Sequence, residues 1–207
     1  MKIIGLIPAR KGSVTIKNKN IVPFHGKPLI QWSIDSIQES KLINNNFVST
    51  DSEVVKRIAN KSAIGIINRP QYLANNTATT LSVLKHAVKF TNADVIVLLQ
   101  ATSPFRKSGI VDLCLKKFLK SKADSLATGT FLTLAPWGKY NNLPKEKLKK
   151  WFFDDGSIYI LSAKDILKDK WTGRKKEYFI VEKQYAQEID DLYDLELNKF
   201  LMKKYKK

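Results

Sequence analysis

The sequence predicts a three-layer α/β fold with a mostly parallel sheet, formed as a single domain over residues 1–207. Short apolar runs typical of buried strands alternate along the chain with longer amphipathic stretches typical of helices. Strands that alternate with helices of this length form βαβ units, in which helices cover both faces of a parallel sheet. A chain of 207 residues, 43% of them hydrophobic, also suits one buried core.

The expected strands share a short apolar sequence bounded by turn residues, and they cover 2–8, 47–50, 64–67, 94–99, 123–130 and 155–160. The expected helices lie between them and cover 28–40, 51–63, 79–91 and 108–120. Ser49, Thr50 and Asp51 are candidate caps of the second helix, because their side chains accept hydrogen bonds from free N–H groups.

The alternation becomes less regular after residue 130. Residues 131–150 contain two prolines and many lysines, so 131–180 is expected to include an excursion from the core. The stretch 185–204 ends in a final helix.

The formal net charge of +17 raises the question of nucleic-acid binding. The lysines are scattered along the chain instead of forming one stripe with aromatic residues, which disfavours that function. A positive field also suits an anionic small substrate.

The hydrophobic runs and the cysteine content predict a protein without a membrane span in a reducing compartment. No run approaches 18 uncharged apolar residues, so no membrane span is predicted. Cys114 is the single cysteine, which precludes an internal disulfide and fits the cytoplasm. Its place in an apolar helical stretch predicts that it packs in the core.

The loops that follow the strands are the expected site. Right-handed crossovers place the carboxyl ends of parallel strands along one edge, where ligands bind. The first such loop contains Gly12 and four cations, which are Arg10, Lys11, Lys17 and Lys19. Backbone N–H groups with cations can hold a triphosphate, although a solvated basic loop explains the charges equally well. The loop is neither GxGxxG nor a P-loop, which disfavours both of those sites.

Seven segments extend the pattern over nearly the whole chain. They read IPARKGSVTIKNKN (7–20), HGKPLI (25–30), STD (49–51), RPQYLANNTATT (69–80), LQATSPFR (99–106), DGSIY (155–159) and EIDDLYDL (188–195). In this order they resemble the motifs of the CMP-sugar synthetases, the acylneuraminate cytidylyltransferase family. The resemblance implies a Rossmann-like nucleotidyltransferase fold. It also implies transfer of CMP from CTP to the anomeric hydroxyl of an acidic nine-carbon, nonulosonic sugar, with release of pyrophosphate.

The resemblance also implies residue roles. The nucleotide-binding residues would be Arg10, Ser13, Lys19, Asn20, Arg69, Ala78 and Thr79. Arg10 and Lys19 would also stabilise charge on the α-phosphate during attack. The sugar-binding residues would be Gln100, Thr102, Ser103, Arg106 and Tyr159. Arg106 could instead form a structural ion pair, and Tyr159 could be core.

The acidic segment would hold Mg²⁺, with Asp190 and Glu188 as ligands and Asp190 essential for catalysis. One or two carboxylates suffice for Mg²⁺, which keeps several waters. Alternation along an extended segment places Glu188 and Asp190 on the same face and turns Asp191 away. Asp194 is expected to cap or pin the last helix.

Three positions depart from the family pattern: Val14 replaces a basic residue, and Glu188 and Asn76 each replace an aspartate. The region 131–180, which in the family supplies a sugar-pocket wall and dimer contacts, is short. One alternative is therefore a degenerate paralogue that binds nucleotide without turnover. A second is a 3-deoxy-manno-octulosonate cytidylyltransferase, although the QGD-type segment of that group is absent from 99–103. The expected partners are CTP, the acidic sugar and a second copy in a homodimer.

Overall fold

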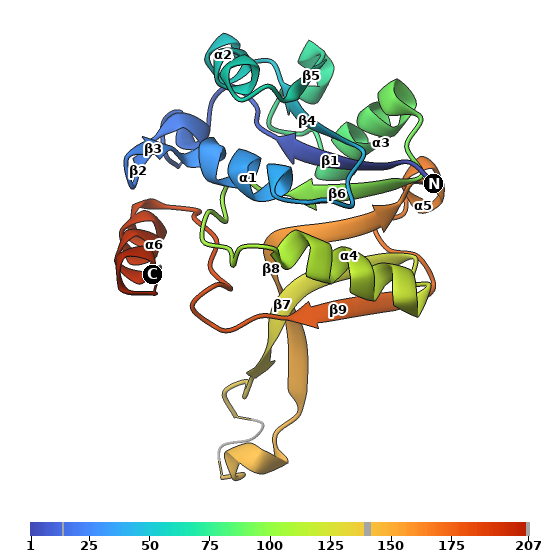
Figure 1. The fold of residues 1–207 in the computed structure, drawn as a ribbon. Coiled ribbons are helices and arrows are strands. Elements are labelled where there is room, and N and C mark those ends of the chain that lie inside the picture. The colour runs from blue at the N-terminus through green and yellow to red at the C-terminus, as the bar shows by residue number, and fades with distance from the viewer. Residues whose placement is uncertain (14, 139–141, 206–207) are drawn as a thin grey trace.

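A computed structural model describes residues 1–13, 15–138 and 142–205, and most of these form one seven-stranded sheet with helices on both faces (Figure 1). The strand order is β5-β4-β1-β6-β8-β7-β9. The strands are β1 (Ile3–Pro8), β4 (Asn45–Thr50), β5 (Gly65–Asn68), β6 (Val95–Leu99), β7 (Ser125–Thr133), β8 (Lys150–Ser162) and β9 (Lys176–Ile180). Within this sheet, β8 alone runs against its neighbours. The predicted mostly parallel α/β architecture is therefore confirmed.

Helices cover the two faces of the sheet. They are α1 (Leu29–Gln38), α2 (Glu53–Lys61), α3 (Thr80–Thr91), α4 (Ile110–Ser121), α5 (Ala163–Leu167) and α6 (Leu192–Tyr205). Alternate residues of β1 point to opposite faces. Ile3 and Ile7 pack in the cluster formed with α1, α2 and α4, whereas Ile4 and Leu6 pack in the cluster formed with α3 and α5.

The cap of α2 differs from the expected residues. Ser52 caps the helix, and its Oγ accepts a hydrogen bond from the N–H of Val55 at 3.4 Å. Ser49 and Thr50 belong to β4, so neither lies at the helix start. Asp51 is also too early in the chain, and its side chain instead accepts a hydrogen bond from the N–H of Lys11 at 2.6 Å.

Short elements complete the fold. β2 (Pro23–Phe24) and β3 (Lys27–Pro28) form a hairpin, and the 3-10 turns are η1 (Lys19–Ile21), η2 (Gln71–Leu73) and η3 (Lys145–Lys147). The last helix, α6, stands beside this hairpin (Figure 1), where His25 Nε2 lies 2.9 Å from the carbonyl oxygen of Lys199. Ile16 of the first loop, Phe24, Ile189 and Leu195 pack together there in a third apolar cluster. The first loop and the acidic segment therefore share one small core.

The region 131–180 contains both sheet and excursion. β7 and β8 continue beyond the sheet as a two-stranded arm that carries η3 and projects from the bottom of Figure 1. The second half of β8 lies between β6 and β7, and β9 forms the edge of the sheet. The part that leaves the sheet is thus the arm around residues 130–154, which is narrower than 131–180.

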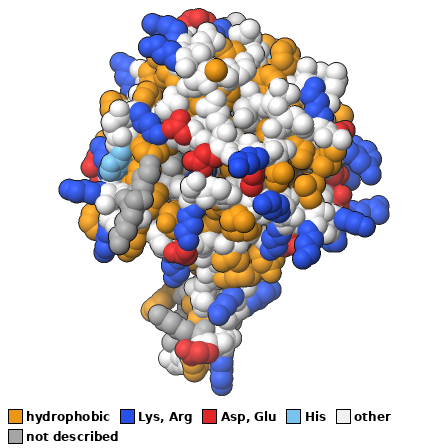
Figure 2. All heavy atoms as spheres, viewed as in Figure 1, with side chains coloured by type: hydrophobic (Ala, Val, Ile, Leu, Met, Phe, Trp, Pro, Cys, Tyr) orange, Lys and Arg blue, Asp and Glu red, His pale blue; other side chains and the backbone are white. Residues whose placement is uncertain are grey.

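Charged side chains of both signs are mixed on the face that Figure 2 shows. Figure 2 shows lysine and arginine side chains distributed across one face, among acidic and hydrophobic ones. Among the helices of the described residues, none combines the length and apolar character needed to cross a bilayer.

Cys114 is fully buried, and burial raises the pKa of its thiol to about 12. We expect negligible reaction of the folded protein with a thiol reagent such as DTNB at mildly alkaline pH, because the thiolate is the reactive form. Unfolding in guanidinium should release one reactive thiol per chain. Comparable labelling of native and unfolded protein would contradict this burial.

Candidate active site

A cleft of about 250 Å³ opens at the carboxyl ends of β1, β5 and β6. Its walls come from the loops that follow these strands and from the start of α3. The lining residues are Pro8, Arg10, Gly12, Ser13, Lys19, Asn20, Arg69, Ala78, Thr80, Val83, Gln100 and Thr102. Most of the residues assigned to the nucleotide from the sequence therefore meet in one place.

The first loop is held at its base and exposes polar groups to the cleft. The N–H of Ala9 donates to the carbonyl of Ser49 at 2.9 Å, and the Asn20 amide donates to the carbonyl of Arg10 at 3.1 Å. Gly12 has a φ of 76°, a conformation that glycine adopts without strain. Val14 lies outside the described residues.

Arg10 reaches from this loop to the segment that precedes α3. Its Nη1 donates to Oδ1 of Asn76 at 2.7 Å. An amide carries no charge, so this bond orients the guanidinium and leaves its positive charge available to an anion. Asn76, the position where the family commonly has aspartate, thus contributes a neutral partner.

Arg69 forms a fixed cation at the floor of the cleft. It is only 8% exposed, and its Nη2 donates to the carbonyl of Ser49 at 2.8 Å. Burial lowers its pKa to about 10, while Asp51 opposes this shift and Arg10 adds to it. Arg69 therefore remains charged at neutral pH, although it cannot swing out to follow a ligand.

The start of α3 forms one side of the cleft. Thr79 is its N-cap, and the Thr79 hydroxyl accepts a hydrogen bond from the N–H of Ser82 at 3.2 Å. Thr79 is not among the lining residues, whereas its neighbours Ala78 and Thr80 are. Because N–H groups at a helix start carry partial positive charge, this end of the helix favours an anionic ligand.

Lys19 joins the cleft to the acidic segment. Its Nζ donates to the carbonyl oxygens of Ile189 and Asp190, each at 2.9 Å, and lies 3.6 Å from Oδ1 of Asp190. The Lys19 side chain is 12% exposed, and that of Asp190 is 75% exposed. Ile189 is fully buried between Glu188 and Asp190, so the two carboxylates flank an apolar anchor.

Glu188 is held from the opposite side by the loop after β6. The hydroxyl of Thr102 donates to Oε1 of Glu188 at 2.8 Å, and the N–H of Ile189 donates to the carbonyl of Thr102 at 2.8 Å. Burial raises the pKa of Glu188, and the nearby Asp190 adds to this, whereas the Thr102 hydrogen bond and Lys19 oppose it. Glu188 and Asp190 both line a second cavity, of about 420 Å³, between the arm and residues 183–190.

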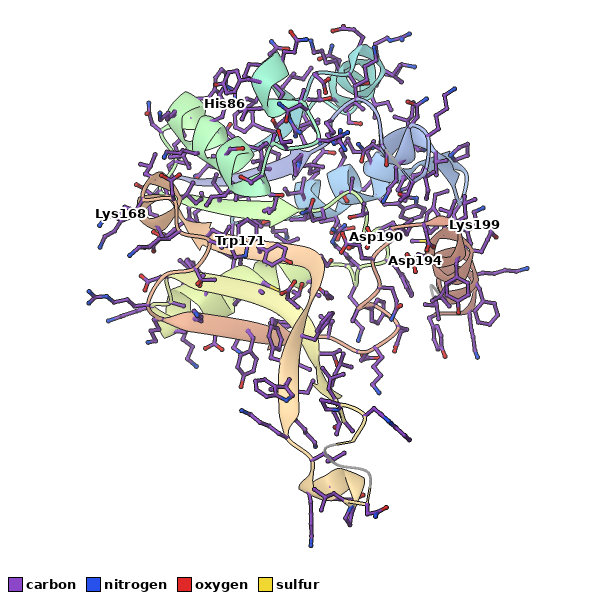
Figure 3. The ribbon with its side chains drawn as sticks, turned by 180° about the vertical axis from the view of Figure 1, so that it is seen from behind. His86, Lys168, Trp171, Asp190, Asp194 and Lys199 are labelled. Carbon is purple, nitrogen blue, oxygen red and sulfur yellow. The ribbon has the colours of Figure 1, made fainter. Side chains whose placement is uncertain are left out.

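Asp191 and Asp194 serve the start of α6. Oδ2 of Asp194 accepts hydrogen bonds from the N–H groups of Asp190 at 2.9 Å and Asp191 at 3.2 Å. The N–H of Asp194 in turn donates to Oδ1 of Asp191 at 3.0 Å. This reciprocal pairing resembles a capping box. It pins α6 directly after Asp190 (Figure 3) and agrees with the role expected for Asp194.

The five residues assigned to the sugar separate in the structure. Gln100 and Thr102 line the cleft. Ser103 is 1% exposed, and its Oγ has no hydrogen-bond partner among the described residues. Arg106 lies behind the loop and donates to neutral protein groups, so its contacts are not the ion pair considered from the sequence. Tyr159 lines a different, aromatic cavity.

The aromatic cavity has a volume of about 310 Å³ and lies against β7, β8 and β9. The ring of Trp171 packs edge-on against Tyr159 with centroids 5.1 Å apart, and Figure 3 shows Trp171 beside β8. The hydroxyl of Tyr159 donates to Oδ1 of Asp154. Burial and this hydrogen bond raise the pKa of Tyr159.

Asp154 connects this region to the acidic segment. It lines both the aromatic cavity and the cavity that contains Glu188 and Asp190. The cavity that contains Glu188 and Asp190 therefore adjoins the aromatic cavity at Asp154. Sequence reasoning did not identify Asp154 or Trp171, because neither belongs to the segments that carry the resemblance.

Several known proteins are similar to this chain in sequence or in fold. The chain is 31% identical to an N-acylneuraminate cytidylyltransferase of Escherichia coli O18:K1:H7, over 95% of this chain and 51% of that protein. It is 27% identical to a pseudaminic acid cytidylyltransferase of Campylobacter jejuni serotype O:2, over 98% of this chain and 97% of that protein. The chain thus spans about half the length of the E. coli relative and nearly all of the Campylobacter one.

A solved structure of a CMP:2-keto-3-deoxy-manno-octonic acid synthetase complexed with CTP has the same fold. Its TM-score is 0.76 at 16% identity, and the match covers 99% of each chain. A family model described as cytidylyltransferase matches residues 4–197, which include the cleft, the acidic segment and the start of α6. The chain therefore belongs to the cytidylyltransferase family and, within it, to the CMP-sugar synthetases.

Proposed function

We propose that this chain transfers CMP from CTP to the anomeric hydroxyl of a nonulosonic acid and releases pyrophosphate, in the reducing cytoplasm that its lone buried cysteine fits. The observation that carries the proposal is the junction at Lys19. This residue borders the cleft and also contacts the segment that carries Glu188 and Asp190. A cationic cleft beside a pair of carboxylates suits a nucleoside triphosphate and its counter-ion.

The cleft favours the triphosphate at its basic end. Arg10, Lys19 and the N–H groups around Gly12 and Ser13 provide phosphate contacts, and the fixed charge of Arg69 lies at the floor. The start of α3, with Ala78 and Thr80, offers backbone atoms to the base and ribose. Asn20 supports the loop through its bond to the carbonyl of Arg10.

The acidic segment fits Mg²⁺. Glu188 and Asp190 provide hard oxygen donors on one cavity. Among the described residues, no group of three or more His, Cys, Asp or Glu is placed to hold a metal, so the protein would supply two carboxylates at most. Mg²⁺ readily completes its coordination with phosphate oxygens and water, and when bound it would offset negative charge on the phosphates.

The chemistry is an in-line displacement. The anomeric oxygen forms a bond to the α-phosphorus, the bond from that phosphorus to the bridging β-oxygen breaks, and pyrophosphate leaves. The hydroxyl proton passes to water. Arg10 and Lys19 stabilise the charge that develops on the phosphoryl oxygens.

The aromatic cavity favours a nine-carbon acceptor with apolar substituents. Phe152, Tyr159, Trp171 and Tyr178 offer ring surfaces to acyl or methyl groups, and Asp154 offers an acceptor to hydroxyl or amide donors. The eight-carbon octulosonate carries hydroxyl groups and no acylamino group, so it would leave these rings uncovered. We therefore favour an N-acylated nonulosonate over the octulosonate.

A homodimer is the expected assembly. The arm presents apolar side chains to solvent, among them Trp137 (94% exposed), Trp151 (50%) and Phe153 (58%). Exposed apolar surface of this kind marks interaction sites. Sedimentation equilibrium should give twice the chain mass, and a concentration-independent monomer would exclude a homodimer.

The decisive test is pyrophosphate release from CTP and Mg²⁺ with a panel of acids: sialic, legionaminic and pseudaminic acids and the octulosonate. Release with a nonulosonate, lost without Mg²⁺, is the expected result. Release with the octulosonate alone would transfer the assignment to that substrate. CTP binding without release from any acid would favour a nucleotide-binding paralogue.

Gly156 provides a separate test of the carboxylate pair. Its φ is 68°, and a Cβ at this position would lie 2.5 Å from Oε2 of Glu188. We expect Gly156→Ala to displace that carboxylate and to raise the Mg²⁺ concentration needed for half-maximal activity by about 10-fold. The backbone penalty of about 1 kcal/mol should lower Tm by about 2–4 °C.

Gly109→Ala is the matched control. Gly109 has a φ of 71°, but among the described residues no atom beyond its own chain neighbours lies within 4 Å of an added Cβ. This variant should show a similar fall in Tm with an unchanged Mg²⁺ requirement. An equal shift of the Mg²⁺ requirement in both variants would exclude Glu188 as its cause.

A further inference from the structure

We propose that Arg106 is a positioning residue. It fixes the backbone of the loop after β6, so that Gln100 and Thr102 face the reactants in the cleft. This inference rests on the proposed function for its kinetic consequence. The guanidinium itself lies behind the loop and is absent from the lining of the cleft. Its effect on the reaction is therefore indirect.

The contacts of Arg106 join three elements. Nε donates to the hydroxyl of Ser157 in β8 at 2.8 Å, and Nη1 donates to the hydroxyl of Ser33 in α1 at 2.9 Å. Nη2 donates to the carbonyls of Gln100 at 2.6 Å and Ser157 at 3.0 Å. The planar fork of arginine allows these bonds to form at once, in fixed directions.

These bonds form a ring around the backbone of Gln100. The N–H of Gln100 donates to the carbonyl of Ser157 at 3.2 Å, and its carbonyl accepts from Ser33 Oγ at 3.0 Å as well as from Arg106. Ser33 is fully buried, although it belongs to an amphipathic helix whose neighbouring buried residues are mostly apolar. A buried hydroxyl is retained at low cost only when it is hydrogen-bonded, as it is here.

The ring leads directly to the acidic segment. Thr102, two residues after Gln100, donates to Glu188 and accepts from the N–H of Ile189. If the loop relaxes, Gln100 and Thr102 shift in the cleft, and Glu188 loses its support. Arg106 thus orients groups on the acceptor side, whereas Arg10 is held by Asn76 and Arg69 by Ser49 in β4.

Lysine cannot replace this arrangement. Burial lowers the pKa of Arg106 to about 10, and the nearby Asp155 opposes this shift, so the guanidinium keeps its charge at neutral pH. A lysine ammonium is a single point charge on a flexible stem and cannot reach Ser33, Gln100 and Ser157 together. A lysine at position 106 would therefore keep the positive charge but would not hold the loop in place.

The experiment compares Ser33→Ala, Arg106→Lys and Arg106→Met with wild type in three measurements. These are the acceptor KM, the CTP dissociation constant, and hydrogen–deuterium exchange of peptides covering 99–106 and 186–191. We expect Arg106→Lys to raise the acceptor KM by about 10- to 100-fold, since small misplacements have effects of this size. Ser33→Ala should give a smaller rise in the same direction, and CTP affinity should stay within about twofold of wild type.

Exchange should become faster in both peptides, while residues 53–68 in α2 and β5 keep the wild-type rate. Unchanged exchange in Ser33→Ala and Arg106→Lys would overturn the positioning role, whatever the substrate. A fall in CTP affinity as large as the rise in the acceptor KM would also overturn the positioning role, because that pattern indicates that the whole site is distorted. Failure of the wild-type chain to release pyrophosphate would instead refute the proposed function, and the exchange measurement would still test Arg106.

Discussion

Asp190→Asn is expected to lower kcat/KM for pyrophosphate release by at least about 100-fold, because it removes one of the two carboxylates that we propose hold Mg²⁺. The fold should not change. The side chain is 75% exposed, and the bonds that hold this segment run through its backbone, from Lys19 to the Asp190 carbonyl and from the Asp190 N–H to Asp194. Asparagine preserves the shape of the side chain and removes its charge.

The matched control is Asp191→Asn. It removes the same charge one residue away, where the side chain caps α6 and is absent from the cavity that Glu188 and Asp190 line. Asparagine is also a good cap, so this variant should keep activity within about threefold of wild type. Initial rates over a range of Mg²⁺ concentrations measure both variants. Equal losses of activity in the two variants would show that the net negative charge of the segment matters and that Asp190 has no specific role in binding the metal.

The fold could be predicted as far as local pattern and chain connectivity reach. Each strand and helix expected before residue 130 is present in the structure. The prediction succeeded there because the spacing of apolar residues reflects which face of each element is buried. The place of β8 could not be predicted in this way. Its pairing with β6 and β7 joins segments about 60 and 30 residues apart, and no local signal states that it runs antiparallel.

The residues of the candidate site also fall into a group that topology predicts and a group that it does not. Arg10, Lys19, Arg69 and Gln100 follow strands whose carboxyl ends must meet at one edge, so topology alone brings them together. The neighbours of Arg106 depend on side-chain directions, and Ser33 has no sequence feature that marks it as a partner. Thr79 shows the same limit. Motif position places it beside the nucleotide, but its side chain caps α3.

Lys19→Met is the second large effect expected. Lys19 lies on the cleft and donates to the carbonyls of Ile189 and Asp190, so its loss would remove the proposed phosphate contact and also free the acidic segment. We expect kcat/KM for CTP to fall by at least about 100-fold, as for other preorganised charge-stabilising donors. The Mg²⁺ requirement should rise in the same variant, because Asp190 loses its anchor. Loss of a phosphate contact alone would leave that requirement unchanged.

Lys17→Met provides the comparison. It changes net charge equally, but Lys17 is exposed and absent from the cleft lining, so activity should fall by less than about threefold. Both variants should be assayed at two salt concentrations, since a general field effect is screened by salt and a direct contact is screened much less. A salt-dependent loss of similar size in both would reduce Lys19 to one of many surface cations. A loss confined to Lys19→Met, together with the raised Mg²⁺ requirement, would show that one ammonium group joins the cleft to the acidic segment that we propose holds the metal.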